Sequence, residues 1–104
     1  MQSIFLDYAT VSFHGDLDPA SLHRAMPGLE LRDHTPQTDV ARAIASAEVV
    51  LVNKLRLTRE IIEAAPNLKL IALAATGTNN IDLDAARERG VAVCNLRDYC
   101  TASV

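Results

Sequence analysis

Short apolar runs alternate along this chain of 104 residues with longer segments of helical periodicity. This alternation is typical of repeated strand–helix units, which build a parallel sheet. The five expected strands are SIFLD (3–7), LELR (29–32), EVVLV (48–52), LKLIAL (68–73) and VAVC (91–94). The third run is nearly all apolar and rich in Val, as expected of an inner strand covered on both faces, whereas the second alternates, as expected of an edge strand.

The segments between these runs carry signals for the start and the end of helices. The residues that could cap a helix N-terminus are Asp18, Thr38, Thr58 and Asp82. Pro66 and Gly90 stand where the third and fourth helices are expected to end. The four expected helices are 19–25, 39–47, 59–65 and 83–89. Five strands with four crossover helices predict a flavodoxin-like, doubly wound α/β fold with a parallel sheet in the order 2-1-3-4-5.

Charge and hydropathy exclude several classes of function. The chain has 10 Lys+Arg against 13 Asp+Glu, a formal net charge of −3, and no basic cluster. It therefore lacks the positive surface that most proteins binding nucleic acids or anionic membranes need. The longest nearly uncharged run, 71–81, contains Thr, Gly and two Asn, so we expect no bilayer-spanning segment. Because the N-terminus also lacks a secretory pattern, we expect a cytoplasmic protein without nucleic-acid or membrane partners.

In a doubly wound sheet, ligands bind beyond the carboxyl ends of the strands. The loop AATGTNN (74–80) is small, polar and uncharged, and Gly77 permits backbone conformations in which successive N–H groups face one anion. A carboxylate or phosphate would suit this loop, although a plain strand-to-helix turn fits the residues as well. Lys54, directly after an inner strand and Asn53, is a candidate anion partner or a solvated lysine. Asp7 could serve as an acid or cap a loop.

Other chemistry is not visible in the sequence. The glycines at 15, 28, 77 and 90 spell neither G-x-G-x-x-G nor G-x-x-x-x-G-K-[ST], so no dinucleotide fingerprint or P-loop is present. Cys94 and Cys100 form C-x5-C, which matches neither the usual redox spacing nor a zinc set, and we expect two reduced thiols. The three histidines have no partner at a recognisable catalytic spacing. We therefore expect no cofactor-binding or metal-binding residue in this chain.

From residue 48 to residue 104 the chain resembles the amino-terminal part of the D-2-hydroxyacid dehydrogenases, most closely the glycerate dehydrogenase (hydroxypyruvate reductase) branch. The matching segments are VNK (52–54), LKLI (68–71), AATGTNNIDL (74–83) and AARERGVAVCN (85–95). The tail YCTASV (99–104) is similar to the start of the helix that leads into that family's nucleotide domain. The resemblance implies a substrate-binding domain at 1–98 and the start of a hinge helix at 99–104. A Rossmann domain that binds NAD or NADP would follow.

The resemblance also implies an activity and a site. The parent enzyme, expected to be a homodimer, would reduce a small 2-oxoacid such as hydroxypyruvate or glyoxylate to the D-2-hydroxyacid with NAD(P)H. The loop at Thr76, Gly77 and Thr78 would bind the carboxylate through backbone amides, and Asn53 and Lys54 would face the substrate side chain. The family's catalytic Arg, Glu and His come after the last residue of this sequence, so the isolated chain is expected to be inactive. The alternatives are a flavodoxin-like carboxylate-binding or regulatory module without catalysis, and a related corepressor that acts through partners.

Overall fold

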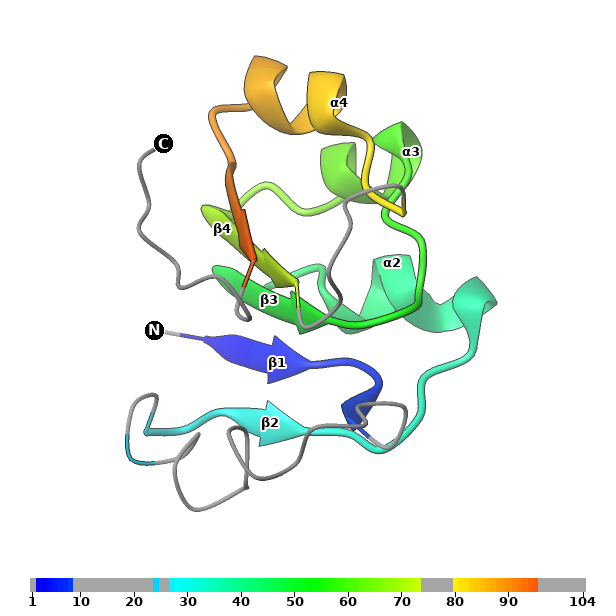
Figure 1. Ribbon diagram of the computed structural model, residues 1–104, viewed down its shortest axis with the longest axis vertical. Coiled ribbons are helices and arrows are strands. Elements are labelled where there is room, and N and C mark those ends of the chain that lie inside the picture. The colour runs from blue at the N-terminus through cyan, green and yellow to red at the C-terminus, as the bar shows by residue number, and fades with distance from the viewer. Residues whose placement is uncertain (1, 9–23, 25–26, 74–79, 96–104) are drawn as a thin grey trace.

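A computed structural model describes residues 2–8, 24, 27–73 and 80–95 of the chain. Its five strands are β1 (Ser3–Phe5), β2 (Glu30–Leu31), β3 (Val49–Val52), β4 (Leu70–Leu73) and β5 (Ala92–Asn95). They form one parallel sheet in the order β2-β1-β3-β4-β5 (Figure 1). The expected doubly wound fold and strand order are therefore confirmed. All four residues of β3 are buried and β2 is the exposed edge, as the patterns of these two runs predicted.

The described helices are shorter than expected. They are the 3₁₀ turn η2 (Gln37–Asp39) and the α-helices α2 (Val40–Ala43), α3 (Arg59–Glu63) and α4 (Leu83–Glu88). Two of the expected caps are confirmed: Thr58 Oγ1 accepts from the Ile61 amide at 3.4 Å and Asp82 Oδ1 from the Ala85 amide at 2.9 Å. Gly90, after α4, has φ +73°, the left-handed conformation that glycine adopts without strain. The helix expected at 19–25 lies outside the described residues.

The cap expected at Thr38 is wrong. Thr38 lies inside η2, and the N-cap of α2 is Asp39, which makes no side-chain capping hydrogen bond. A long-range contact accounts for the earlier start of the turn. The Gln37 side chain donates to the Arg56 carbonyl at 2.9 Å and accepts from the Arg56 amide at 3.0 Å. This pair of bonds joins η2 to the loop after β3, and it outweighs the local preference for a threonine cap.

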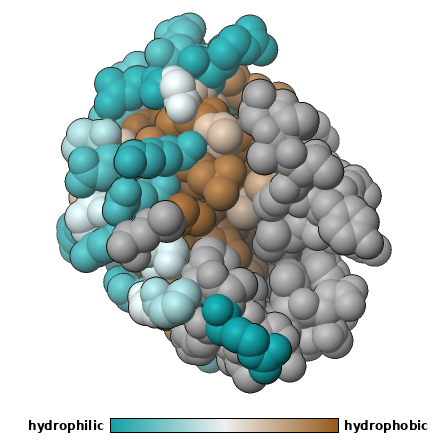
Figure 2. Space-filling model, turned by 90° about the vertical axis from the view of Figure 1, so that its left-hand side faces the viewer, coloured by the Kyte–Doolittle hydropathy of each residue, from teal (hydrophilic) through white to brown (hydrophobic). Residues whose placement is uncertain are grey.

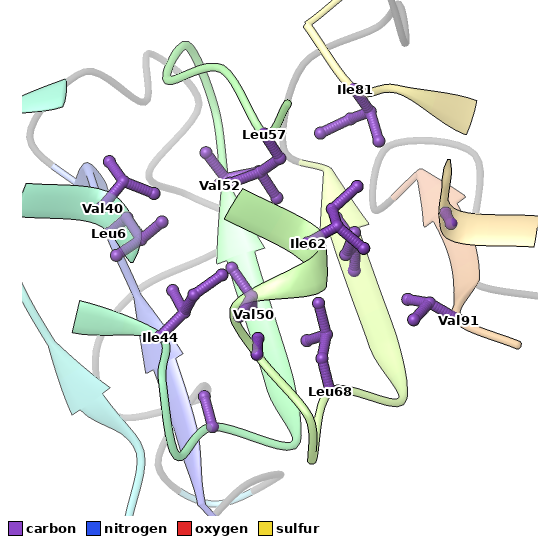
Figure 3. Close-up of a cluster of buried hydrophobic side chains, with 14 of the residues drawn as sticks. Leu6, Val40, Ile44, Val50, Val52, Leu57, Ile62, Leu68, Ile81 and Val91 are labelled. Carbon is purple, nitrogen blue, oxygen red and sulfur yellow. The ribbon is translucent and has the colours of Figure 1, made fainter. Parts of the chain in front are cut away.

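One face of the sheet carries the main core, beneath α2, α3 and α4 (Figures 1 and 3). Alternate side chains of the strands meet the helices there; Val50 and Val52 of β3, for example, lie in the same cluster as Ile62 of α3. Leu51, between the two valines, faces the opposite side of the sheet and joins a second cluster. In that cluster the rings of Phe5 and Tyr8 pack edge to face, with centroids 5.4 Å apart. Both faces of the sheet are therefore apolar, as a doubly wound fold requires.

Three further observations concern membrane spans, metal ligands and the cysteines. In the described part of the chain, no helix has the length and apolar character needed to cross a membrane. Over the same residues, no group of three or more His, Cys, Asp and Glu side chains is arranged to hold a metal ion. Cys94 is disulfide-bonded, so the expectation of a reduced thiol is wrong at this position. Sequence spacing could not predict the bond, because disulfide formation depends on the distance between the Cα atoms of the two cysteines in the folded chain.

Candidate functional site

The carboxyl ends of β1, β3 and β4 meet at one edge of the sheet. The register pairs Phe5 with Leu51 and Val52 with Leu73, so the ends of these three strands lie side by side (Figure 1). Ligands of doubly wound folds bind at this edge. The structure therefore brings the segment after β3, which holds two candidate site residues, next to the end of β4, the strand that precedes the loop expected to bind an anion.

The carboxylate of Asp7 holds the backbone of the segment after β3. Asp7 is 2% exposed, and its Oδ1 accepts from the Asn53 amide at 2.7 Å. Its Oδ2 accepts from the amides of Lys54 at 2.6 Å and Leu55 at 3.2 Å. Three successive N–H groups thus converge on one buried anion, and hydrogen bonds to an ionised acceptor are stronger than neutral ones. These contacts support the loop-capping role, one of the two that the sequence left open for Asp7.

Asn80 holds the same segment from the other direction. Its Nδ2 donates to the carbonyl of Leu55 at 2.8 Å and to that of Asn53 at 3.4 Å. The main chain adds two bonds, from the Leu57 amide to the Asn80 carbonyl at 2.9 Å and from the Asp82 amide to the Leu57 carbonyl at 3.0 Å. The loop after β3 and the end of the loop after β4 therefore form one hydrogen-bonded unit.

The sequence-predicted site residues fall into two groups. Asn53 is 8% exposed, and Lys54 is exposed, so its ammonium group is open to solvent at the ligand edge. Thr76, Gly77 and Thr78 lie outside the described residues. Sequence reasoning gave Asn80 no role in the site, although an asparagine at the end of a polar loop and two residues before the cap of α4 is a usable signal.

A pocket of about 310 Å³ lies where these two loops enter α3 and α4. Its lining consists of Arg56, Leu57, Thr58, Asn80, Ile81 and Asp82. The lining includes one basic and one acidic side chain, so its charge does not select an anion on its own. The amide cluster after β3 does not offer an anion site either, because the Asp7 carboxylate already fills it.

The fold and this edge define the class of protein: a flavodoxin-like α/β domain in which Asn80 is hydrogen-bonded to the loop after β3 at the carboxyl edge of the sheet. Residues 5–104 match the family model described as the catalytic domain of D-isomer specific 2-hydroxyacid dehydrogenases. The chain belongs to this family, and the resemblance seen in its sequence is confirmed.

The relatives agree with this assignment. A hydroxypyruvate reductase from Blautia hydrogenotrophica is 38% identical over 86% of this chain and 29% of its own length. A glycerate dehydrogenase from Methylorubrum extorquens is 40% identical over 67% of this chain and 22% of its own length. The solved NAD complex of a formate dehydrogenase from Staphylococcus aureus superposes with a TM-score of 0.68 and 25% identity, over 91% of this chain and 31% of the other. The chain spans about a third or less of the length of these curated relatives.

Enzymes of this family use a nicotinamide cofactor, as the formate dehydrogenase complex illustrates. The residues of this chain do not fit a dinucleotide. The whole sequence lacks the G-x-G-x-x-G loop on which a pyrophosphate rests. At the ligand edge, the successive amides of 53–55 already face the Asp7 carboxylate, whose charge would repel a phosphate.

Proposed function

We propose that this chain is the substrate-binding part of an NAD(P)-dependent D-2-hydroxyacid dehydrogenase that reduces a small 2-oxoacid, hydroxypyruvate or glyoxylate, to the D-2-hydroxyacid. Family membership supports the reaction, and the names of the two relatives above support the substrate. The observation that carries the proposal is the hydrogen bonding between Asn80 and the loop after β3 at the carboxyl edge of the sheet. Asn80 joins the end of the 74–80 loop to the backbone carbonyls of Asn53 and Leu55.

In this proposal the two loops divide the recognition of the substrate. The amides at Thr76, Gly77 and Thr78 bind the carboxylate of the 2-oxoacid, which suits a small, uncharged loop that contains glycine. Asn53 and Lys54 face the remainder of the substrate. A nicotinamide supplies the hydride when it is bound by a separate domain. The residues of this chain contribute orientation, which lowers the entropic cost of bringing the carbonyl carbon to the hydride donor.

The proposed organisation of the parent protein follows the same reasoning. Residues 1–98 form the substrate-binding domain, and residues 99–104 begin the hinge helix that leads to an NAD(P)-binding Rossmann domain. The parent is proposed to be a cytoplasmic homodimer that acts on small soluble acids. The length of the curated relatives, about three times that of this chain, supports a second domain.

Replacement of Gly77 by Val tests the assignment in the full-length enzyme. A β-branched side chain restricts the backbone and occupies space next to the amides, so we expect KM for hydroxypyruvate to rise about tenfold or more. The measurement is the steady-state rate of NAD(P)H oxidation. Ala45→Val adds a similar bulk at an exposed position between α2 and β3, away from the ligand edge, and should leave KM unchanged. Unchanged kinetics in Gly77→Val would refute the carboxylate assignment.

A further inference from the structure

We propose that Asp7 is a positioning residue for the substrate, because its buried carboxylate sets the place of the loop that presents Asn53 and Lys54. The inference rests on the proposed function and extends it to a residue that does not itself touch the substrate. Asp7 lies 46 positions before Asn53 in the chain, yet its Oδ1 is 2.7 Å from the Asn53 amide nitrogen. A contact of this kind fixes the loop relative to β1 rather than to its own strand.

The chemistry of the contact explains why a carboxylate is needed. A carboxylate only accepts hydrogen bonds, and here it receives three N–H donors from consecutive residues. An amide side chain in its place would turn an NH2 donor toward at least one of these N–H groups, and a hydroxyl would offer a single oxygen to three donors. Its surroundings are closed to water, since Asp7 is 2% exposed, so the bonds are electrostatically strong and their loss is not compensated by solvent.

Asn80 is the second residue that holds the segment 53–55 in place. Asp7 accepts from the amides of Asn53, Lys54 and Leu55, while the Asn80 side chain donates to the carbonyls of Asn53 and Leu55. The amides of all three residues and the carbonyls of two of them are thus held by side chains from two distant parts of the chain. The side chain of Lys54 in this segment is exposed and is therefore available to a ligand. Displacement of the backbone moves the Lys54 side chain with it.

The test compares Asp7→Asn with a matched control, Thr35→Val, in the full-length enzyme. Asp7→Asn keeps the size of the side chain but turns one acceptor into a donor that faces an amide. Thr35 is buried and its Oγ1 donates to the Leu6 carbonyl at 2.9 Å, so Thr35→Val removes one buried hydrogen bond next to Asp7 without touching the loop. We expect Asp7→Asn to raise KM for the 2-oxoacid about tenfold while kcat changes less than about threefold. Thr35→Val should lower the unfolding midpoint and leave KM unchanged.

A second variant and a second readout keep the test decisive if Asp7→Asn folds poorly. Asn80→Ala removes the donors on the other side of the loop and should raise KM in the same direction. Amide hydrogen exchange of the segment 53–55, measured without substrate, should be faster in Asp7→Asn than in Thr35→Val. Unchanged KM and unchanged exchange in Asp7→Asn overturn the inference, and so does an equal rise of KM in Thr35→Val. If the native enzyme reduces no 2-oxoacid, the proposed function fails; the exchange experiment then still decides whether Asp7 holds the loop.

Discussion

At the scale of single residues, the buried polar groups explain the shape of the ligand edge. In the part of the chain that the structure describes, no buried side-chain nitrogen or oxygen lacks a hydrogen-bond partner. The buried polar atoms of Asp7 and Thr35 form hydrogen bonds with main-chain groups near the ends of β1 and β3. An unpaired polar group in the same place would cost about 1–3 kcal/mol. These residues therefore hold loops in place as well as filling space.

The cap of α4 gives a prediction at this scale. Asp82 accepts from the Ala85 amide at 2.9 Å, so Asp82→Ala leaves that amide without its partner at the start of the helix. We expect the free energy of unfolding to fall by about 1 kcal/mol, measured by urea denaturation. Asp84→Ala is the control, because Asp84 is an exposed acid in the first turn of the same helix and is not the cap. Equal losses in the two variants would show that charge near the helix start, and not the capping bond, is responsible.

At the scale of elements, α3 and α4 are joined by an exposed ion pair. Arg59 of α3 donates from Nη1 and Nη2 to the two carboxylate oxygens of Glu88 of α4, at 2.8 and 3.3 Å. The hydrogen bond from Arg59, followed by the charge of Arg59, lowers the pKa of Glu88 below its ordinary 4.5. The same pair raises the pKa of Arg59, which remains protonated throughout the range in which the protein can be studied. Exposed pairs contribute little on their own, but a two-point contact restricts how the helices lie against each other.

The Glu88→Gln variant tests how the lowered pKa of Glu88 makes the stability of the protein depend on pH. A carboxyl group whose pKa is lower in the folded state than in the unfolded state stabilises the protein at pH values above the unfolded-state pKa. This stabilisation is lost as the pH falls through the folded-state pKa. Native protein should therefore exceed Glu88→Gln in its urea midpoint at pH 7. The difference should shrink between about pH 5 and pH 3. Asp33→Asn, which removes an exposed carboxylate after β2, is the control for net charge. A difference between native and Glu88→Gln that is independent of pH would contradict the assignment.

At the scale of the whole molecule, the parallel sheet collects at one edge groups that are distant in sequence. β1, β3 and β4 are neighbours, so residues near positions 7, 53 and 80 meet although 46 and 27 positions separate them. Such an edge can orient a substrate. The reaction of the family also needs a hydride donor and a proton donor, and the sequence of this chain holds no dinucleotide fingerprint that would bind the first.

A prediction follows for the 104-residue chain by itself. We expect it not to oxidise NAD(P)H in the presence of hydroxypyruvate or glyoxylate, because orientation alone does not transfer a hydride. The measurement is the decrease of NAD(P)H absorbance, with the full-length enzyme as the positive control. Turnover by the isolated chain would contradict the proposed division between substrate-binding and nucleotide-binding parts. Binding of the 2-oxoacid without turnover by the full-length protein as well would favour the carboxylate-binding module over the dehydrogenase.

The sequence by itself determined the strand order, the inner and edge strands and two helix caps. These features depend on interactions within a few residues or on alternation along one strand: Val50 and Val52 face the helices because they alternate with Leu51, and Thr58 caps α3 because the Ile61 amide is three residues away. The sequence also placed Asn53 and Lys54 at the ligand edge, since they directly follow a buried strand.

Only the tertiary structure decided how the loops at that edge are held. The bonds from Asp7 to the segment after β3, from Asn80 to Leu55 and from Gln37 to Arg56 join residues 19 to 48 positions apart. No local sequence pattern predicts such pairs, because they depend on the pairing of the strands and the packing of the core. The Gln37 contact displaced the cap expected at Thr38 for this reason. The packed sheet determines which distant backbone groups lie within hydrogen-bond distance of a polar side chain. Such bonds can replace the local partner that the sequence suggests.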